Sequence, residues 1–166
     1  MEFIFCEEDR FYRDFVNLIA EVECGEHYDC NNKQHVEWLK KRVHSIYLMG
    51  GMSLCVYENG NPLGFLLYQH DLGLEGVCCF GKVARIMMFA LADESRGKGL
   101  GKQLLAKVCQ KVKEAGADCI YTDTYALNSG AINFYLNNGF IQVGVHEGEN
   151  GIDDAGQLYL YKVLES

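Results

Sequence analysis

Three glycines alternate with other residues in the segment Arg96-Gly-Lys-Gly-Leu-Gly-Lys102. Glycine has no Cβ, so the backbone N–H groups of such a turn can approach a bound anion closely. The apolar periodicity of residues 100–115 predicts a helix directly after the turn, whose N-terminus adds N–H donors and the positive end of its dipole. Arg96 and Lys98 or Lys102 can supply positive charge. The segment therefore predicts a pyrophosphate site, and a plain structural turn is the alternative.

The spacing of these glycines fits neither of the two commoner nucleotide loops. A Walker loop needs Gly-x-x-x-x-Gly-Lys-Ser/Thr, whereas Gln103 follows Lys102 here. The dinucleotide fingerprint needs Gly-x-Gly-x-x-Gly, whereas Gly97, Gly99 and Gly101 alternate. A nucleotide-dependent kinase or dehydrogenase is therefore disfavoured.

A second candidate group lies in the predicted helix over 129–138. Asn128 and Tyr135 are two helical turns apart, so they share one face with the small Ala131. A phenol with an unperturbed pKa of about 10 is protonated at neutral pH and can act as a general acid. The alternative for Tyr135 is a core aromatic with a satisfied hydroxyl. The alternative for Asn128 is a simple helix N-cap, and both of its roles could hold at once.

Hydrophobic periodicity predicts the elements that must position these residues. We expect strands over 2–6, 52–58, 63–70, 83–91, 119–125, 140–146 and 157–164. We expect helices over 9–23, 34–45, 100–115 and 129–138, and loops over 24–33 and 71–81. This order is mixed α/β within a single domain, residues 1–166, with the strand–turn–helix at 83–115 as its central unit.

Together, the two motifs resemble those of the GNAT (Gcn5-related) N-acetyltransferases. The pyrophosphate motif of that family is R/Q-x-x-G-x-G/A, which Arg96–Gly101 matches, and its N-x-x-A-x-x-x-Y helix matches Asn128–Tyr135. The resemblance extends along nearly the whole chain. It implies the GNAT acyl-CoA N-acyltransferase fold: α/β, with a central mixed, mostly antiparallel sheet whose middle strands splay apart, flanked by helices.

The same resemblance implies acetyl-CoA as cosubstrate, lying between the strands over 83–91 and 119–125. Backbone groups at the end of the first strand would pair with the pantetheine arm and polarise the thioester. Tyr135 would protonate the departing CoA thiolate. The implied cofactor contacts are Phe89, Ala90, Leu91, Arg96, Gly97, Lys98, Gly99, Leu100, Gly101, Lys102, Asn128, Ala131 and Tyr135.

The general base is less well defined. Direct transfer needs a neutral amine, so a carboxylate or a water chain must take its proton. Many members of the resembled family carry a Glu on the strand before the glycine turn, where this chain has Met87. Asp123 on the next strand is the best remaining candidate, with Glu75, His70 or a water relay as alternatives. Asp123 could equally be a structural partner of the two strands.

The acceptor is expected to bind at the loop between the first two helices. Residues 24–38 are acidic and aromatic, which suits a cationic amine, and Tyr28 and Trp38 are the substrate-binding candidates. The alternative is a solvated loop with Trp38 packed on the core. The expected partner is a small-molecule amine or a peptide N-terminus.

Composition narrows the remaining classes. The net charge of −8, without a basic stripe, disfavours nucleic acid. No apolar run approaches the length that crosses a bilayer, about 20 residues. Eight cysteines without a C-x-x-C pair predict reduced core thiols and no metal, which agrees with an expected cytoplasmic location. We expect a monomer or a homodimer. The alternative to an N-acetyltransferase is a non-catalytic acetyl-CoA-binding or sensor module.

Overall fold

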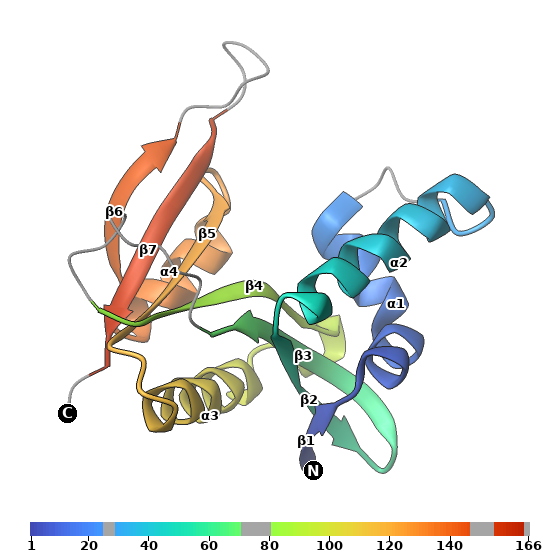
Figure 1. Cartoon of the computed structure of the whole chain (residues 1–166), viewed down its shortest axis with the longest axis horizontal. Coiled ribbons are helices and arrows are strands. Elements are labelled where there is room, and N and C mark those ends of the chain that lie inside the picture. The colour runs from blue at the N-terminus through green and yellow to red at the C-terminus, as the bar shows by residue number, and fades with distance from the viewer. Residues whose placement is uncertain (25–28, 71–80, 147–154, 165–166) are drawn as a thin grey trace. The chain divides into compact units, whose positions relative to one another are not determined.

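The chain forms two compact units in a computed structural model that describes residues 1–24, 29–70, 81–146 and 155–164. The first unit is Met1–His70 with Met87–Val108, and the second is Asp71–Ile86 with Cys109–Ser166. Hydrogen-bonded strands follow the order β1-β2-β3-β4-β5-β7-β6 (Figure 1). The strands are β1 Glu2–Cys6, β2 Gly51–Glu58, β3 Asn61–Gln69, β4 Val83–Leu91, β5 Cys119–Tyr125, β6 Ile141–His146 and β7 Gln157–Val163. The helices are α1 Glu8–Cys24, α2 Lys33–Leu48, η2 Asp93–Ser95, α3 Leu100–Glu114 and α4 Ser129–Asn137.

The sheet is mixed and mostly antiparallel, as the sequence predicts. The pairs β1–β2, β2–β3, β5–β7 and β6–β7 are antiparallel, whereas β4 and β5 pair in parallel. The parallel pairing covers Val83–Arg85 against Cys119–Tyr121, and β5 pairs with β7 along its whole length. β4 contributes its first residues to the second unit and Met87–Leu91 to the first.

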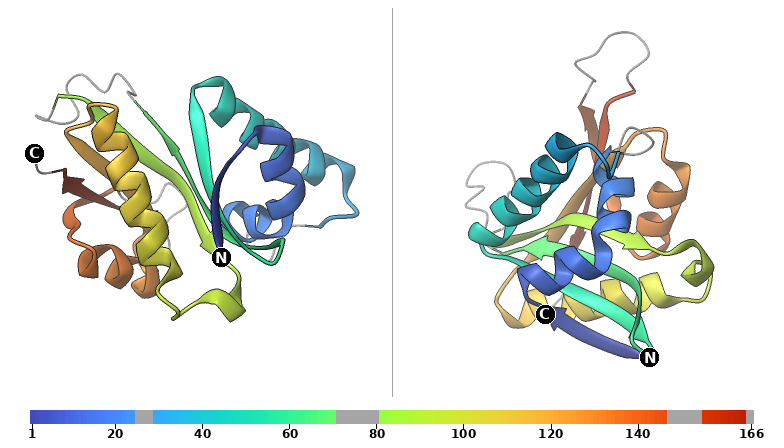
Figure 2. Two further views of the ribbon diagram at one scale, coloured as in Figure 1. Left: turned by 90° about the horizontal axis from the view of Figure 1, so that it is seen from below. Right: turned by 90° about the vertical axis from the view of Figure 1, so that its right-hand side faces the viewer.

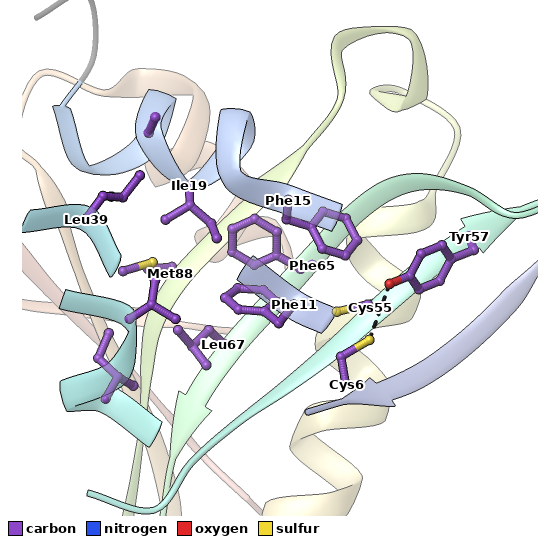
Figure 3. Packing of buried hydrophobic residues seen from close by; sticks show 13 residues of the cluster. Cys6, Phe11, Phe15, Ile19, Leu39, Cys55, Tyr57, Phe65, Leu67 and Met88 are labelled. Atoms are coloured by element: carbon purple, nitrogen blue, oxygen red, sulfur yellow. Dashed lines mark hydrogen bonds between the residues drawn. The ribbon is translucent and has the colours of Figure 1, made fainter. Parts of the chain in front are cut away.

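In the first unit, α1 and α2 lie together on one face of β2 and β3 (Figure 2). The core beneath them is aromatic: the rings of Phe11 and Phe65 meet edge to face at 4.8 Å, and Phe15 meets Phe65 at 5.3 Å (Figure 3). Ile19 and Leu39 are fully buried beside them. The buried positions Phe11, Phe15 and Ile19 of α1 are four residues apart and therefore share one helix face.

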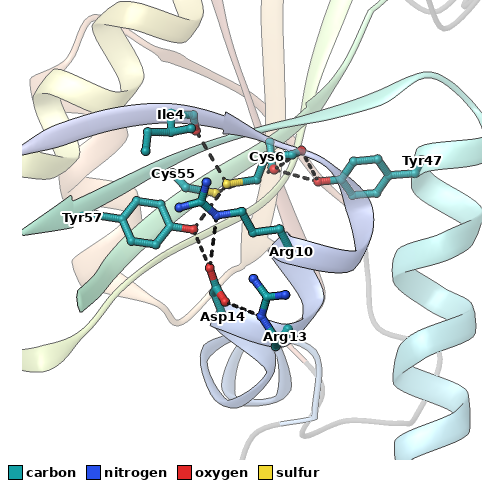
Figure 4. Close-up of polar contacts among 9 residues, drawn as sticks. Ile4, Cys6, Arg10, Arg13, Asp14, Tyr47, Cys55 and Tyr57 are labelled. Atoms are coloured by element: carbon teal, nitrogen blue, oxygen red, sulfur yellow. Dashed lines mark hydrogen bonds and ion pairs between the residues drawn. The ribbon is translucent and has the colours of Figure 1, made fainter. Parts of the chain in front are cut away.

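A polar network joins α1 to the first two strands (Figure 4). The hydroxyl of Tyr57 donates to Asp14 Oδ2 at 3.0 Å and lies 3.3 Å from Cys6 Sγ. Burial raises the pKa of Tyr57, and its contacts with Cys6 and Asp14 add to that effect. Arg10 lies over the Tyr57 ring, 4.9 Å from its centroid. The network fixes the start of α1, the helix whose later residues reach the glycine turn.

In the second unit, α4 covers one face of the β5–β7–β6 strands (Figure 1). Strand alternation directs Thr122 and Leu160 to this covered face, where both are buried. Gly139 follows α4 at a φ of 84°, in the left-handed region that favours glycine, and the chain then enters β6. β6 is the edge strand of this group.

The predicted element bounds agree closely with the structure. The strands over 2–6, 83–91 and 119–125 are reproduced residue for residue, and the helix predicted over 34–45 extends to Leu48. The strand predicted over 63–70 begins two residues earlier, because β3 pairs with β2 as far as Asn61. Residues 71–80 of the predicted loop lie outside the described residues. Among the helices that the structure describes, none is both long and apolar enough to cross a membrane.

Candidate active site

The glycine turn leads directly into α3. Gly97 and Gly99 have φ values of 73° and 78°, a left-handed conformation that L-residues with a Cβ rarely adopt. The first hydrogen bond into the helix runs from Gln103 N to Gly99 O, at 3.2 Å. The N–H groups just before it, at the start of α3, therefore have no carbonyl within the helix to bond to. A Cβ placed on Gly97 or Gly99 would meet no atom of the described residues within 4 Å, so these residues leave space beside the turn. This geometry suits a bound anion.

Arg96, the predicted cationic residue of the turn, contacts two carboxylates. Its Nη1 lies 2.8 Å from Asp93 Oδ1, and its Nη2 lies 3.2 Å from Glu21 Oε1 on α1. Its Nε donates to the carbonyl of Leu91 at 3.2 Å. All three charged side chains are more than half exposed, and exposed ion pairs contribute at most about 1 kcal/mol. A phosphate could therefore compete for Arg96.

The end of β4 is held close to β3 in the first unit. A Cβ on Gly64 would lie 2.6 Å from the carbonyl oxygen of Ala90, so only glycine permits this approach. Ala92, the first residue after β4, donates its N–H to the carbonyl oxygen of Leu63 at 2.9 Å. Phe89, Ala90 and Leu91 are each half-buried. The strand segment that is predicted to bind pantetheine therefore lies directly against β3.

Tyr135 is the most enclosed of the candidate residues. Its side chain is 5% exposed and forms a hydrogen bond with Thr122 of β5. The pKa of Tyr135 is raised to about 12, mainly by burial; the charge of Asp123 adds to the rise and the bond to Thr122 offsets part of it. The phenol is therefore protonated throughout the neutral range.

Asn128 acts as the N-cap of α4. Its Oδ1 accepts from the N–H of Ala131 at 3.0 Å, which is one of the two roles that the sequence allows. The cap fixes the first turn of the helix that carries Tyr135. Ala131 is half-buried.

Asp123 is held by an arginine that the sequence analysis did not single out. Arg85 Nη2 donates to Asp123 Oδ1 at 2.7 Å, and the guanidinium lies over the Tyr121 ring at 5.4 Å. Burial alone would lower the pKa of Arg85, but the hydrogen bond and charge of Asp123 outweigh burial and raise it. A charged residue inside the otherwise apolar strand Val83–Leu91 was the available signal.

Of the two substrate-binding candidates, the structure describes only Trp38. Tyr28 lies outside the described residues. Trp38 lies on α2 with half of its surface exposed. Its role in acceptor binding stays a prediction.

Comparison with known proteins places the chain in a family. Residues 12–140 match the family model described as the acetyltransferase (GNAT) family, and the chain belongs to that family. The predicted enzyme class, acyltransferase, is confirmed at the level of the family.

Solved structures share the fold. The ribosomal-protein-S18-alanine N-acetyltransferase from Escherichia coli is 14% identical, with a TM-score of 0.73 over 99% of this chain and 96% of that chain. A streptothricin-type acetyltransferase from Bacillus anthracis, solved in complex with acetyl coenzyme A, is 21% identical, with a TM-score of 0.59 over 69% of this chain and 63% of that chain. These likenesses confirm the predicted GNAT fold.

A curated relative matches a shorter segment. The tRNA(Met) cytidine acetyltransferase TmcA 2 from Saccharolobus solfataricus is 30% identical over 66 residues, which are 40% of this chain. The match spans 8% of the length of that relative.

Proposed function

We propose that this protein transfers an acetyl group from acetyl-CoA to a primary amine by direct attack. The observation that carries the proposal is the turn at Gly97–Gly99, where two left-handed glycines open α3 beside empty space. Such a turn offers backbone donors and the helix dipole to a pyrophosphate. The acetyl-CoA found in one structural neighbour supports the same cofactor.

The chemistry requires a bond to form and a bond to break at the acetyl carbon. The amine nitrogen attacks the thioester carbonyl, and the oxyanion is stabilised by a backbone N–H at the end of β4, among Phe89–Leu91. The intermediate then collapses, the C–S bond breaks, and Tyr135 gives its proton to the CoA sulfur. Burial raises the pKa of a thiol as it raises that of a phenol. The pKa of the CoA thiol, which accepts the proton, therefore shifts in the same direction as that of Tyr135, which donates it.

The proton of the attacking amine needs a separate acceptor, and we assign it to Asp123. Its side chain is about a quarter exposed, so an amine or a bridging water can reach the carboxylate. The contact with Arg85 and the presence of Met87 on β4 favour a second candidate function, a non-catalytic acetyl-CoA-binding module.

The acceptor that we propose is a small-molecule amine or a peptide N-terminus. Several structural neighbours act on amines by name, including the alanine N-acetyltransferase of ribosomal protein S18. The name of the curated relative refers to tRNA, but the net charge of −8 opposes binding of a polyanion. Free thiols at Cys6, Cys55 and Cys119 fit a reducing compartment such as the cytoplasm.

An assay of thiol release separates the enzyme from the binding module. Purified protein is incubated with acetyl-CoA and a panel of amines, amino acids, polyamines and peptides, and free CoA is titrated with a thiol reagent. Binding is followed in parallel by the rise in melting temperature with acetyl-CoA, compared with ATP and NAD. Release of CoA with one acceptor supports the enzyme. Binding of acetyl-CoA without release across the panel would leave the binding module.

A further inference from the structure

One face of the second unit's sheet carries a group of polar and aromatic side chains. Arg85 of β4 pairs with Tyr121 of β5, and Tyr121 pairs with Tyr161 of β7. Two residues further along β5, Asp123 pairs with Tyr159. Directly paired residues point to the same side of a sheet, as do residues two apart on a strand. These five side chains therefore share one face, which we call the tyrosine face.

The opposite side of the same strands is already occupied. Thr122 points there and bonds to Tyr135 of α4, and Leu158 and Leu160 are buried on it. The five residues of the tyrosine face are each only half-buried. The tyrosine face thus combines a charged pair with aromatic surface that a small ligand can reach.

Arg85 has an unused hydrogen-bond donor. Its Nη2 donates to a single oxygen of Asp123, while its Nε is shielded from solvent and has no hydrogen-bond partner among the residues that the structure describes. Buried polar atoms in folded proteins are nearly always paired, so an orphaned donor indicates a missing partner. About a third of the Arg85 side chain is exposed, so a ligand can contact it, but the ligand must displace the groups that shield Nε before it can bond to that atom.

The missing partner must be a hydrogen-bond acceptor, and the charges decide its class. A cationic group would meet Asp123, whose charge is already balanced by Arg85. A carboxylate would meet a planar guanidinium with an unused Nε, and Nε together with Nη2 forms the edge that binds carboxylates through two parallel bonds. Asp123 accepts only from Nη2, so the Nε donor of the same edge is left for a second acceptor.

We infer that the tyrosine face binds the acceptor and that Arg85 recognises a carboxylate on it, so that the acceptor amine is an amino acid. The inference rests on the proposed function and names the substrate class of the same enzyme. The rings of Tyr121, Tyr159 and Tyr161 would contact the acceptor's side chain, which favours an aromatic or aliphatic amino acid over a polar one.

Two series of acceptors test this inference. The phenylalanine series is L-phenylalanine, L-phenylalaninamide and 2-phenylethylamine, and the leucine series is L-leucine, L-leucinamide and isoamylamine. Acetylation is followed by CoA release, and kcat/KM is compared between the carboxylate and the amide. We expect the carboxylate to be preferred about tenfold or more in at least one series, because a charge-assisted bond is stronger than a neutral one.

Variants then assign the preference to Arg85. In Arg85→Gln, the ratio of kcat/KM for carboxylate to amide should fall about tenfold, and in Arg85→Lys, which keeps the charge but has no planar fork, it should fall by less. Comparing ratios cancels the different reactivities of the amines. Arg13→Gln removes an exposed arginine from α1 and should leave the ratio unchanged. Retained acetyl-CoA binding shows that a variant is folded, and Arg85→Lys carries the test if Arg85→Gln does not fold.

The outcomes separate the inference from the proposed function. Acetylation of amines with no preference for the carboxylate, or a preference that survives both Arg85 variants, would overturn the inference and leave the enzyme intact. No acetylation of any amine would instead contradict the proposed function. A preference that is lost in the Arg85 variants and kept in Arg13→Gln supports both.

Discussion

A substitution in the glycine turn tests the proposed pyrophosphate site, because its effect on stability can be measured separately from its effect on acetyl-CoA affinity. Gly99 has a φ of 78°, and a Cβ there would meet nothing within 4 Å in the part of the chain that the structure describes. Gly99→Ala therefore introduces backbone strain without a clash. A left-handed L-residue costs about 1–2 kcal/mol, and the alanine recovers about 0.4–1 kcal/mol by restricting the unfolded chain. The net loss of about 1 kcal/mol should lower Tm by about 2–4 °C in a chain of this size.

The loss of cofactor affinity should be larger than the loss of stability. The new methyl group would stand in the open space that the pyrophosphate is proposed to occupy, and a lost hydrogen bond to a charged group costs about 1.5–3 kcal/mol. The Kd for acetyl-CoA should therefore rise about 10- to 150-fold. Isothermal titration measures the Kd, and thermal unfolding without ligand measures the strain.

A matched control lies in the β2–β3 hairpin. Gly60 has a φ of 83° and equally open surroundings, so Gly60→Ala carries the same strain away from the turn. It should lose similar stability and keep the wild-type Kd. If Gly99→Ala kept its affinity, or if both variants lost it equally, the assignment of the turn to the pyrophosphate would be refuted.

Three further predictions follow from the same geometry. Tyr135→Phe should lower kcat by about 10²- to 10⁴-fold with the acetyl-CoA Kd within about twofold, and steady-state kinetics showing unchanged turnover would exclude its acid role. Glu21→Gln frees Arg96 from one carboxylate, so acetyl-CoA should bind up to about fivefold more tightly at low salt. Glu23 lies on the same helix as Glu21 but pairs with Arg42 of α2, so Glu23→Gln should leave the affinity unchanged. Stability should fall as the pH rises from about 10 to 12, because burial raises the pKa of both Tyr68 and Tyr135 to about 12 while the unfolded phenols lose their protons at about 10. Each tyrosine contributes at most about 3 kcal/mol to the free energy of unfolding, and this contribution is fully present below pH 10. Urea titrations at several pH values should therefore show that the free energy of unfolding of Tyr68→Phe declines less steeply above pH 10 than that of the wild type.

The elements near the site could be predicted because each depends on local signals. The strand Val83–Leu91 is apolar on both faces, the glycines mark the turn, and Asn128 precedes an amphipathic segment. Each of these signals lies within or directly beside the element that it predicts. The glycine-turn prediction thus follows from backbone chemistry alone.

The contacts that modify the site join residues far apart in sequence. Glu21 reaches Arg96 across 75 positions, and Arg85 reaches Asp123 across 38. The second contact also depends on the parallel register of β4 and β5, which no local pattern specifies. Trp38 shows the opposite limit: its type suggests burial, but its place on the exposed side of α2 leaves it half exposed.

The alternation of β5 separates the two proton-transfer roles. Thr122 points to the face covered by α4 and bonds to Tyr135, while Asp123, the next residue, points to the tyrosine face and contacts Arg85. Tyr135 and Asp123 thus lie on opposite sides of one strand, and the charge of Asp123 still adds to the raised pKa of Tyr135. The proposed reaction thus receives its proton from one face of the sheet and releases one to the other.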